Sequence, residues 1–171
     1  ADFEAAKKRS LRVIDATCPL VTRVHNEAKK HLREGKKIIL VGHRGHQEVK
    51  GTTGQGEMAL MDDQEDPPPP EWDPDTEVAI LTQTTLSVDD TASMVDRINT
   101  AFGNVTVRND ICYATTNRQS AVKELVAIVE VVLVVGSQTS SNCRRLREVA
   151  ERAGVPSYLI NSPDELDLGW F

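Results

Sequence analysis

The heptapeptide KKIILVG, residues 36–42, sets the fold class, because four consecutive apolar residues in it end at a glycine. A strand whose side chains are all apolar is typical of a parallel sheet that helices cover on both faces. The same pattern returns in VAILTQTT (78–85) and VVLVVG (131–136). Helical patterns separate these strands, so the sequence predicts an α/β fold with parallel strands and right-handed crossovers.

The helices begin and end at recognisable signals. Pro19 is expected to open a helix that stops at Gly35, and Ser87 to cap a helix over residues 87–102. Further helices are predicted after residue 112 and over 144–154, the second one closed by Gly154. Shorter strands are predicted at the start of 12–20 and over 57–61, 104–110 and 155–160, with an acidic, proline-rich surface excursion over 62–75.

The composition limits the classes of function. The chain has 171 residues, of which 39% are hydrophobic and 27% charged, with a net charge of -6. This balance is ordinary for a globular protein and argues against a nucleic-acid or anionic-membrane partner. No run approaches the roughly 18–20 apolar residues that span a bilayer, and the charged N-terminus is unlike a signal peptide. Three cysteines without paired spacing predict reduced thiols in a cytoplasm.

An internal repeat organises the residues that carry chemistry. At an offset of 94 residues, Cys18 falls on Cys112 and Gly42 falls on Gly136. Each copy contains a cysteine at a strand end, a helix, a buried strand, a glycine and a polar loop, which suggests two units related by a pseudo-rotation. Ligands of open parallel sheets bind at the carboxyl ends of strands, so both cysteines and both loops should surround one cavity. Cys143 is placed outside the repeat, as a packing residue.

The two cysteines and the polar residues of the first copy also have a purely structural interpretation. Cys18 and Cys112 could be buried packing residues, or metal or cluster ligands favoured by the dipole of the helix that follows. His43 and His46 could cap a helix, bind zinc, or bind phosphate together with glycine amides. Glu48 could be a surface charge or, in a closed anion pocket, a proton donor with a raised pKa.

The polar residues of the second copy are similarly ambiguous by themselves. Ser140, Ser141 and Asn142 could simply cap the following helix, or offer hydroxyls, an amide and backbone N–H groups to an anion. Thr84 lies in TQTT (82–85), which is either ordinary strand-end polarity or a set of neutral groups suited to orienting a hydroxyl.

Five motifs, in order and spacing, resemble those of the 4-hydroxy-3-methylbut-2-enyl diphosphate reductase family. They are DATCPLVTRVH (15–25), GHRGHQEVKGTTGQ (42–55), LTQTTLSVDDT (81–91), NDICYATTNRQ (109–119) and VVLVVGSQTSSN (131–142). The resemblance implies three α/β units around a pseudo-threefold axis (a trefoil-like arrangement), with an iron–sulfur (4Fe-4S) cluster held by one cysteine from each unit. It also implies the last step of the methylerythritol phosphate pathway, in which an allylic hydroxyl is removed reductively to give isopentenyl and dimethylallyl diphosphate. Ferredoxin or flavodoxin would supply the electrons, in a bacterial cytoplasm.

The resemblance also assigns roles to single residues. Cys18 and Cys112 match two of the three cluster ligands. Glu48 matches the proton-relay residue, Thr84 its hydroxyl partner beside the substrate, and His46 a ligand of the diphosphate. No direct contact is carried over for His43. The remaining diphosphate-binding residues implied by the match are Ser140, Ser141 and Asn142.

The resemblance divides the chain into residues 1–17, the end of a first unit or a linker, 18–110, the second unit, and 111–171, most of the third. The rest of the first unit and a C-terminal serine motif would lie outside it. With two of the three cysteines, the chain alone is expected to bind no stable cluster, to be inactive and to expose apolar surface. A non-catalytic diphosphate-binding α/β module is the alternative, whereas a zinc hydrolase has the wrong ligand set.

Overall fold

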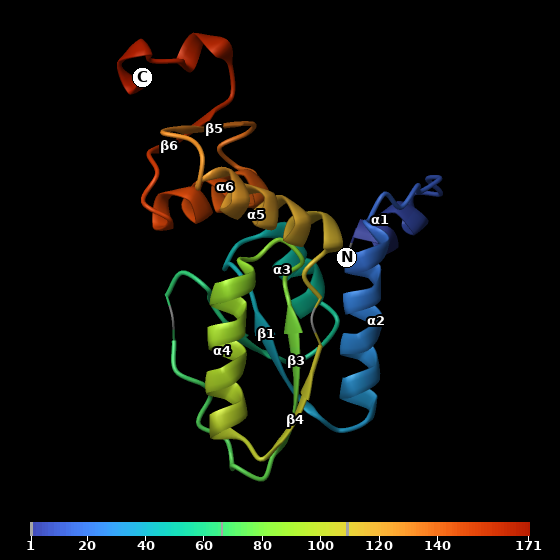
Figure 1. Ribbon diagram of the computed structural model, residues 1–171. Helices are drawn as coiled ribbons and strands as arrows, with labels where there is room; N and C mark the ends of the chain where they lie inside the picture. The colour runs from blue at the N-terminus through green and yellow to red at the C-terminus, as the bar shows by residue number, and fades with distance from the viewer. Residues whose placement is uncertain (1, 66, 109) are drawn as a thin grey trace.

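The computed structural model describes residues 2–65, 67–108 and 110–171. Figure 1 shows one sheet with helices on both sides and, beyond it, a smaller sheet with two helices. The helices are α1 (Asp2–Lys8), α2 (Pro19–Arg33), α3 (Gln47–Thr53), α4 (Val88–Ala101), α5 (Tyr113–Leu125) and α6 (Ser141–Arg152), with 3-10 turns η1 (Pro163–Glu165) and η2 (Leu168–Trp170). The strands are β1 (Lys37–Val41), β2 (Ala59–Met61), β3 (Glu77–Thr82), β4 (Asn104–Val107), β5 (Val132–Val135) and β6 (Ser157–Ile160).

The larger sheet has the strand order β2-β1-β3-β4, and all of its pairings are parallel. Along β1, Ile38 and Leu40 pack in the cluster that contains residues of α2, whereas Ile39 and Val41 pack in the cluster that contains residues of α4. Figure 1 shows these two helices on opposite sides of the sheet. Because both faces are covered, residues 38–41 of β1 are all apolar, and the predicted α/β class with parallel strands is confirmed.

The smaller sheet consists of β5 and β6, which pair in parallel from Val132 opposite Ser157 to Val135 opposite Ile160. Helices α5 and α6 pack against each other and against this sheet, around a small apolar cluster. The cover is less complete than in the larger sheet, since the side chain of Val135 is 72% exposed. This part therefore has a thinner core than the rest of the chain.

The two halves of the predicted repeat share local geometry. Cys18 and Cys112 each occupy the N-cap of the helix that follows, with φ −53°, ψ 133° and φ −71°, ψ 144° respectively. Four residues later, Thr22 and Thr116 each donate a side-chain hydroxyl to the carbonyl oxygen of that cysteine at 3.4 Å. These matching caps support a repeated unit. The pseudo-threefold axis and the division at residues 18–110 and 111–171 stay predictions.

The glycines at the ends of β1 and β5 show the same correspondence and correct one expectation. A Cβ on Gly42 would lie 2.6 Å from Val49 Cγ2, and one on Gly136 would lie 2.5 Å from Cys143 Sγ. In both places the missing side chain lets a helix approach the strand end closely. Val49 and Cys143 are themselves 94 residues apart. Cys143 therefore lies inside the repeat, because the repeat keeps a packing position while the residue type changes.

Two other expectations need correction. No strand forms over residues 11–18, where Ile14 is 80% exposed, because no strand among the described residues lies beside this segment to share its backbone hydrogen bonds. Helix α6 begins at Ser141, three residues before its predicted start, since Ser140 caps it. Asn109, inside the strand predicted over 104–110, lies outside the described residues, as do Ala1 and Asp66. Among the described helices, none combines the length and the apolar character needed to cross a membrane.

Candidate active site

Three loops at the carboxyl ends of parallel strands form the candidate site. The loop after β1 begins at Gly42 and leads to His46, which caps α3. The end of β3 runs into residues 83–85, and the loop after β5 leads to Ser140, which caps α6. Ligands of open α/β proteins bind at this edge of a sheet, and helix N-termini there favour anions.

Glu48 and Thr84 are brought together from α3 and from the end of β3, 36 residues apart in the sequence. Thr84 N donates to Glu48 Oε1 at 2.8 Å, and Thr84 Oγ1 donates to Glu48 Oε2 at 3.0 Å. Thr84 is only 5% exposed. One residue therefore fixes both oxygens of the carboxyl group, in the pair that the resemblance assigns to proton transfer.

The surroundings of Glu48 favour its protonated form. Burial raises the pKa of Glu48 above its ordinary value, and the two hydrogen bonds from Thr84 counteract part of that rise. The negative charge of Asp110 adds to it. A carboxyl with a raised pKa keeps its proton at higher pH than an exposed glutamate does, which suits a general acid.

Cys112 is attached to the same strand end. Its backbone N–H donates to Thr84 O at 2.9 Å. Its side chain caps α5, where Thr115 N donates to Cys112 Sγ at 3.2 Å and Thr115 Oγ1 lies 2.9 Å from the sulfur. Cys112 thus presents its sulfur at the N-terminus of α5, next to the residue that holds Glu48.

Cys18 has the corresponding backbone position but a different environment. It is the N-cap of α2, its side chain accepts no hydrogen bond from that helix, and it is exposed. Helix α2 is attached to the segment before Cys112, because Glu27 Oε1 and Arg108 Nη1 form an ion pair at 2.8 Å. Within the described residues, Cys18 does not enter the hydrogen-bond network around Glu48.

His46 caps α3 and also carries a ring N–H group that can donate to an anion. Its Nδ1 accepts a hydrogen bond from Glu48 N at 3.2 Å. Burial lowers the pKa of His46, electrostatic interaction with His43 and Arg144 lowers it further, and Asp63 acts in the opposite direction. A neutral imidazole that accepts at Nδ1 carries its proton on Nε2. The Nε2–H group can therefore donate to an anion while the ring itself is uncharged.

Residues 140–142 lie where the loop after β5 enters α6. Ser140 is occupied as a cap, since its Oγ accepts a hydrogen bond from Cys143 N at 3.3 Å. Ser141 Oγ accepts one from Thr85 Oγ1 at 3.2 Å. Among the described residues, Asn142 Oδ1 is buried without a hydrogen-bond partner. Buried acceptors are rarely left unpaired, so Asn142 marks a place where a ligand or a water molecule can donate.

Gln83 is missing from the predicted site residues, although it connects the loops after β1, β3 and β5. Its side chain is almost fully buried, and its Oε1 accepts a hydrogen bond from His43 N at 3.0 Å. Its Nε2 donates to Thr85 Oγ1 at 2.9 Å and to Ser141 Oγ at 3.3 Å. In the sequence, Gln83 is only one neutral residue of TQTT, and no local pattern indicates that it reaches α6.

Arg145 is the second residue that sequence reasoning missed. It is 6% exposed, it contacts the carboxylate of Asp63, and its Nη1 lies 2.7 Å from Glu148 Oε2 and 3.4 Å from Asp90 Oδ2. Arg152 Nη1 also contacts Asp90, at 2.5 Å. These ion pairs attach α6 to α4 and to the segment after β2. The sequence shows the arginines of the predicted helix but not the carboxylates that they meet.

His43 lies beside two carboxylates and forms the one group of metal-ligand side chains found in the described part of the chain. Its Nδ1 is 3.7 Å from Asp62 Oδ1 and 3.8 Å from Asp63 Oδ1. The other oxygen of each carboxylate already has a cationic or N–H partner, Arg44 N at 2.8 Å for Asp62 and Arg145 for Asp63. We interpret the group as a set of polar contacts that holds the loop after β1 against the loop after β2.

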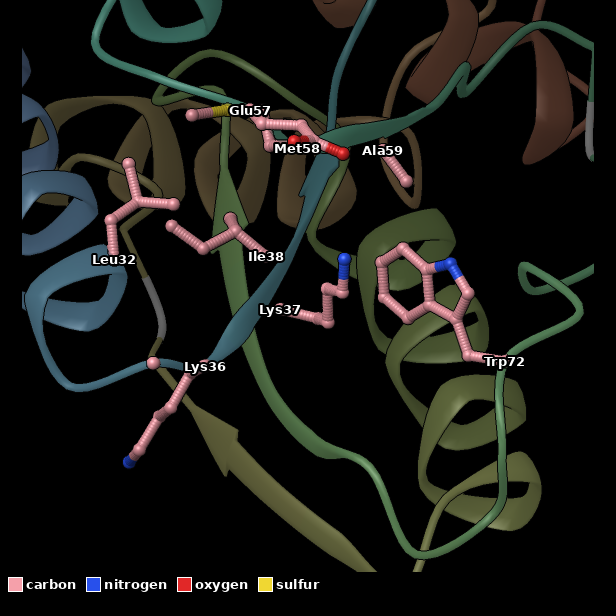
Figure 2. Close-up of a pocket in the computed structure, with 9 residues that line it drawn as sticks. Leu32, Lys36, Lys37, Ile38, Glu57, Met58, Ala59 and Trp72 are labelled. Carbon is pink, nitrogen blue, oxygen red and sulfur yellow. The ribbon is translucent and has the colours of Figure 1, made fainter.

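The cavity in Figure 2 lies away from these loops. It is formed at the amino end of β1, where Lys37 and Trp72 lie on one side of the strand and Leu32, Ile38 and Met58 on the other. Lys37 Nζ is 5.9 Å from the centroid of the Trp72 ring. None of the predicted site residues lines this cavity, so it takes no part in the chemistry described above.

Comparison with known proteins identifies the family. A family model described as LytB protein matches residues 1–171. The chain belongs to the LytB protein family. This membership confirms the resemblance drawn from the five motifs.

Two curated relatives carry the same enzyme name. The chain is 51% identical over 177 residues to the 4-hydroxy-3-methylbut-2-enyl diphosphate reductase of Pseudomonas putida (strain W619), and 49% identical over 176 residues to the protein of that name from Acinetobacter baumannii (strain AYE). Each match covers 98% of this chain and 56% of the relative. The chain thus spans about half the length of the curated relatives it matches.

Two solved structures of such reductases resemble this chain. The Plasmodium falciparum enzyme matches with a TM-score of 0.91 and 35% identity, over 98% of this chain and 54% of that one. A second structure, described as the terminal enzyme of the non-mevalonate pathway, matches with a TM-score of 0.61 and 34% identity, over 99% of this chain and 62% of that one. The LytB-family fold is therefore shared over almost the whole of the chain.

Proposed function

We propose that this chain carries part of the active site of a 4-hydroxy-3-methylbut-2-enyl diphosphate reductase. Such an enzyme uses two electrons and two protons to remove an allylic hydroxyl as water, and it leaves isopentenyl or dimethylallyl diphosphate. The observation that carries the proposal is the pair of Glu48 and Thr84, a buried carboxyl with a raised pKa that one residue holds by two hydrogen bonds. The enzyme name shared by relatives at 49–51% identity supports it.

The loops after β1 and β5 supply groups for the diphosphate end of the substrate. His46 offers an Nε2–H donor, and the N-terminus of the twelve-residue helix α6 offers backbone N–H groups together with Ser141 and Asn142. Such groups bind phosphate oxygens without buried lysines or arginines. Ser140 is also among the residues that the resemblance assigns to the diphosphate, and its Oγ already accepts a hydrogen bond as the cap of α6.

The cysteines fit an iron–sulfur cluster as two of its ligands. Cys18 and Cys112 both stand at helix N-caps, and Cys112 Sγ already accepts an N–H hydrogen bond, an interaction that tunes cluster sulfurs. Cys143 does not fit as a third ligand, because its sulfur packs against Gly136 in the small apolar cluster. Cys18 and Cys112 would hold such a cluster, which when bound would supply the electrons of the reduction.

The proton chemistry belongs to residues of this chain. Burial raises the pKa of Glu48, and Thr84 Oγ1 lies 3.0 Å from Glu48 Oε2, so a proton on the carboxyl can pass through the hydroxyl to a bound substrate oxygen. The backbone hydrogen bond from Cys112 to Thr84 O holds this relay beside a cluster ligand. Protonation of the allylic hydroxyl makes water, and not hydroxide, the leaving group.

The proposal extends to partners and to the behaviour of the isolated chain. Ferredoxin or flavodoxin would deliver the electrons, and reduced thiols at Cys18 and Cys112 suit a cytoplasmic location. Two thiolates leave a four-iron cluster short of protein ligands. We therefore expect the 171 residues alone to hold no stable cluster after anaerobic addition of iron and sulfide, and to show no reductase activity.

A graft tests the function in a complete protein. This chain would replace the matching 177-residue region of the Pseudomonas putida relative, and the anaerobically purified graft would be assayed for reduction of the allylic diphosphate with a reduced dye. We expect iron binding and turnover within about tenfold of the parent enzyme, which corresponds to about 1.4 kcal/mol. The parent enzyme and a graft with Glu48→Gln are the controls.

The alternative function gives a different outcome. An iron-loaded graft that binds the substrate but does not reduce it would contradict the proposal and favour a non-catalytic diphosphate-binding module. A graft that reduces the substrate and loses that activity with Glu48→Gln would exclude the module.

A further inference from the structure

The amide of Gln83 has a fixed orientation. A backbone N–H group can only donate, so the amide atom that meets His43 N at 3.0 Å is the oxygen, Oε1. The NH2 group of Gln83 therefore points the other way, towards Thr85 and Ser141. At 1% exposure the side chain has no access to bulk water that could replace these partners.

This orientation determines the direction of the next hydrogen bonds. Both hydrogens of Gln83 Nε2 are used, one for Thr85 Oγ1 at 2.9 Å and one for Ser141 Oγ at 3.3 Å. Thr85 Oγ1, which receives the first, donates its own hydrogen to Ser141 Oγ at 3.2 Å. Ser141 Oγ therefore receives two hydrogen bonds, and its own proton must point towards a third partner.

We propose that Gln83 is a positioning residue that directs the proton of Ser141 towards the diphosphate. The inference rests on the proposed function, because it takes Ser141 as part of the diphosphate site. Ser141 is the first residue of α6, where the helix N-terminus already favours an anion. Hydrogen bonds that run in one direction polarise one another, so the chain from Gln83 through Thr85 makes Ser141 a better donor.

Substitutions of Gln83 can separate the direction of its hydrogen bonds from the shape of its side chain. Gln83→Met keeps the length of the side chain but removes the donors and the acceptor. Gln83→Glu also keeps the shape, but a carboxylate only accepts, so Thr85 and Ser141 would turn their protons towards it and away from the anion. The proposal therefore predicts loss of anion affinity in both variants.

A second buried amide serves as a matched control. Gln119 of α5 is 2% exposed, its Nε2 donates to Leu86 O at 2.8 Å, and its Oε1 accepts from Val88 N at 3.1 Å. Like the Gln83 amide, it connects the smaller sheet's part of the chain to the segment that follows β3. It has no hydroxyl chain leading to residues 140–142. Gln119→Met therefore reproduces the loss of a buried amide bridge without a change at Ser141.

The experiment measures binding of inorganic pyrophosphate to the 171-residue chain by titration calorimetry. We expect Gln83→Met and Gln83→Glu to weaken the affinity about tenfold or more, in line with the loss of hydrogen bonds to a charged group. Gln119→Met should change the affinity less than about twofold, while its urea midpoint falls about as much as that of Gln83→Met. Gln83→Glu retains a polar side chain of the same size and carries the test if Gln83→Met does not fold.

A double substitution shows whether Gln83 acts through Ser141. If it does, Gln83→Met should weaken binding much less in a chain that already carries Ser141→Ala. Additive effects would overturn the inference, as would unchanged affinity in both Gln83 variants, equal loss in Gln119→Met, or no pyrophosphate binding by the unsubstituted chain. The proposed function is tested apart from this by the graft, since pyrophosphate binding requires neither a cluster nor electrons.

Discussion

Thr84 hydrogen-bonds both carboxyl oxygens of Glu48, from its backbone N at 2.8 Å and from its hydroxyl Oγ1 at 3.0 Å. The backbone group always donates, but the hydroxyl can donate or accept. When Glu48 carries a proton on Oε2, that proton can bind Thr84 Oγ1, and the hydroxyl proton of Thr84 becomes free for another acceptor. The same two residues therefore fit both protonation states, as a proton relay requires.

The substitution Glu48→Gln should remove catalysis and keep the geometry. A glutamine can accept from Thr84 N with Oε1 and donate to Thr84 Oγ1 with Nε2, but it has no proton to transfer. We expect kcat of the graft to fall about 100-fold or more, the size of a general-acid contribution, with KM changed less than about threefold. Steady-state kinetics at matched iron content measures this. A Gln variant with parental kcat would show that Glu48 is not the proton donor.

The pH dependence of stability should also report on Glu48. Burial raises the pKa of its carboxyl in the folded chain above the unfolded value. A group of this kind stabilises the fold below the unfolded pKa, and that stabilisation is lost as pH rises through the folded pKa. The free energy of unfolding of the 171-residue chain should therefore decline over this range, and the decline should be smaller in Glu48→Gln. Urea unfolding at a series of pH values tests it, and parallel curves for the two chains would contradict it.

Replacing Thr84 should move the titration of Glu48. The side-chain hydrogen bond from Thr84 lowers the pKa of Glu48, so its loss in Thr84→Val raises that pKa further. If activity needs protonated Glu48, the fall of kcat/KM at high pH should shift to higher pH in the Thr84→Val graft. The maximum rate should drop, because the relay is interrupted. Thr84→Ser keeps the hydroxyl and should retain the parental profile; a shift in that control would point to a steric cause.

The sequence predicted what depends on local pattern. The all-apolar strands, the helix that opens at Pro19 and the cap at Ser87 are all present, because burial on both faces and cap chemistry are encoded within a few residues. The strand predicted near Ile14 does not form, for the opposite reason. A strand exists only where a neighbour shares its hydrogen bonds, and a short apolar run does not contain that information.

Contacts between distant segments were the part that local patterns could not supply. Gln83 meets Ser141 across 58 residues, and Arg145 meets Asp63 across 82. Nothing near any of these residues in the sequence indicates its partner. The resemblance to a family placed Glu48 and Thr84 in one site, since it carries three-dimensional information that spacing alone lacks. It said nothing about the residues that hold the loops together.

The three cysteines should differ in their effect on iron. In the graft, Cys18→Ser and Cys112→Ser should each reduce the iron content and the visible absorption strongly, because each removes a proposed cluster ligand at a helix N-cap. Cys143→Ala should leave both unchanged, since its sulfur packs against Gly136. Iron and acid-labile sulfide counts on anaerobic samples measure this. Loss of iron with Cys143→Ala would instead place that sulfur at the cluster.

Arg145 should be a large contributor to stability even though it touches no proposed ligand group. Arg145 is 6% exposed, and its guanidinium contacts the carboxylate of Asp63, whose side chain is 2% exposed. Arg145→Met would leave Asp63 buried without its cation, which costs about 3–5 kcal/mol in the free energy of unfolding. Adding Asp63→Asn should recover part of this loss, because the uncompensated charge disappears.

The matched control for Arg145 is Arg147, two residues further along α6. Arg147 pairs with Glu151 at 3.2 Å in a more exposed position. Arg147→Met should cost less than about 1 kcal/mol in the free energy of unfolding, as exposed pairs do.

Unfolding at low pH gives an independent check of the ion pairs around Asp90. Burial would raise the pKa of Asp90, but the hydrogen bond and charge of Arg152 and the charge of Arg145 hold it below its ordinary value. Asp90 thus stabilises the fold above its unfolded pKa, and this is lost as pH falls through its folded pKa. Urea unfolding of Asp90→Asn should show a weaker loss of stability on acidification, and equal losses in both chains would mean that the ion pairs contribute nothing measurable.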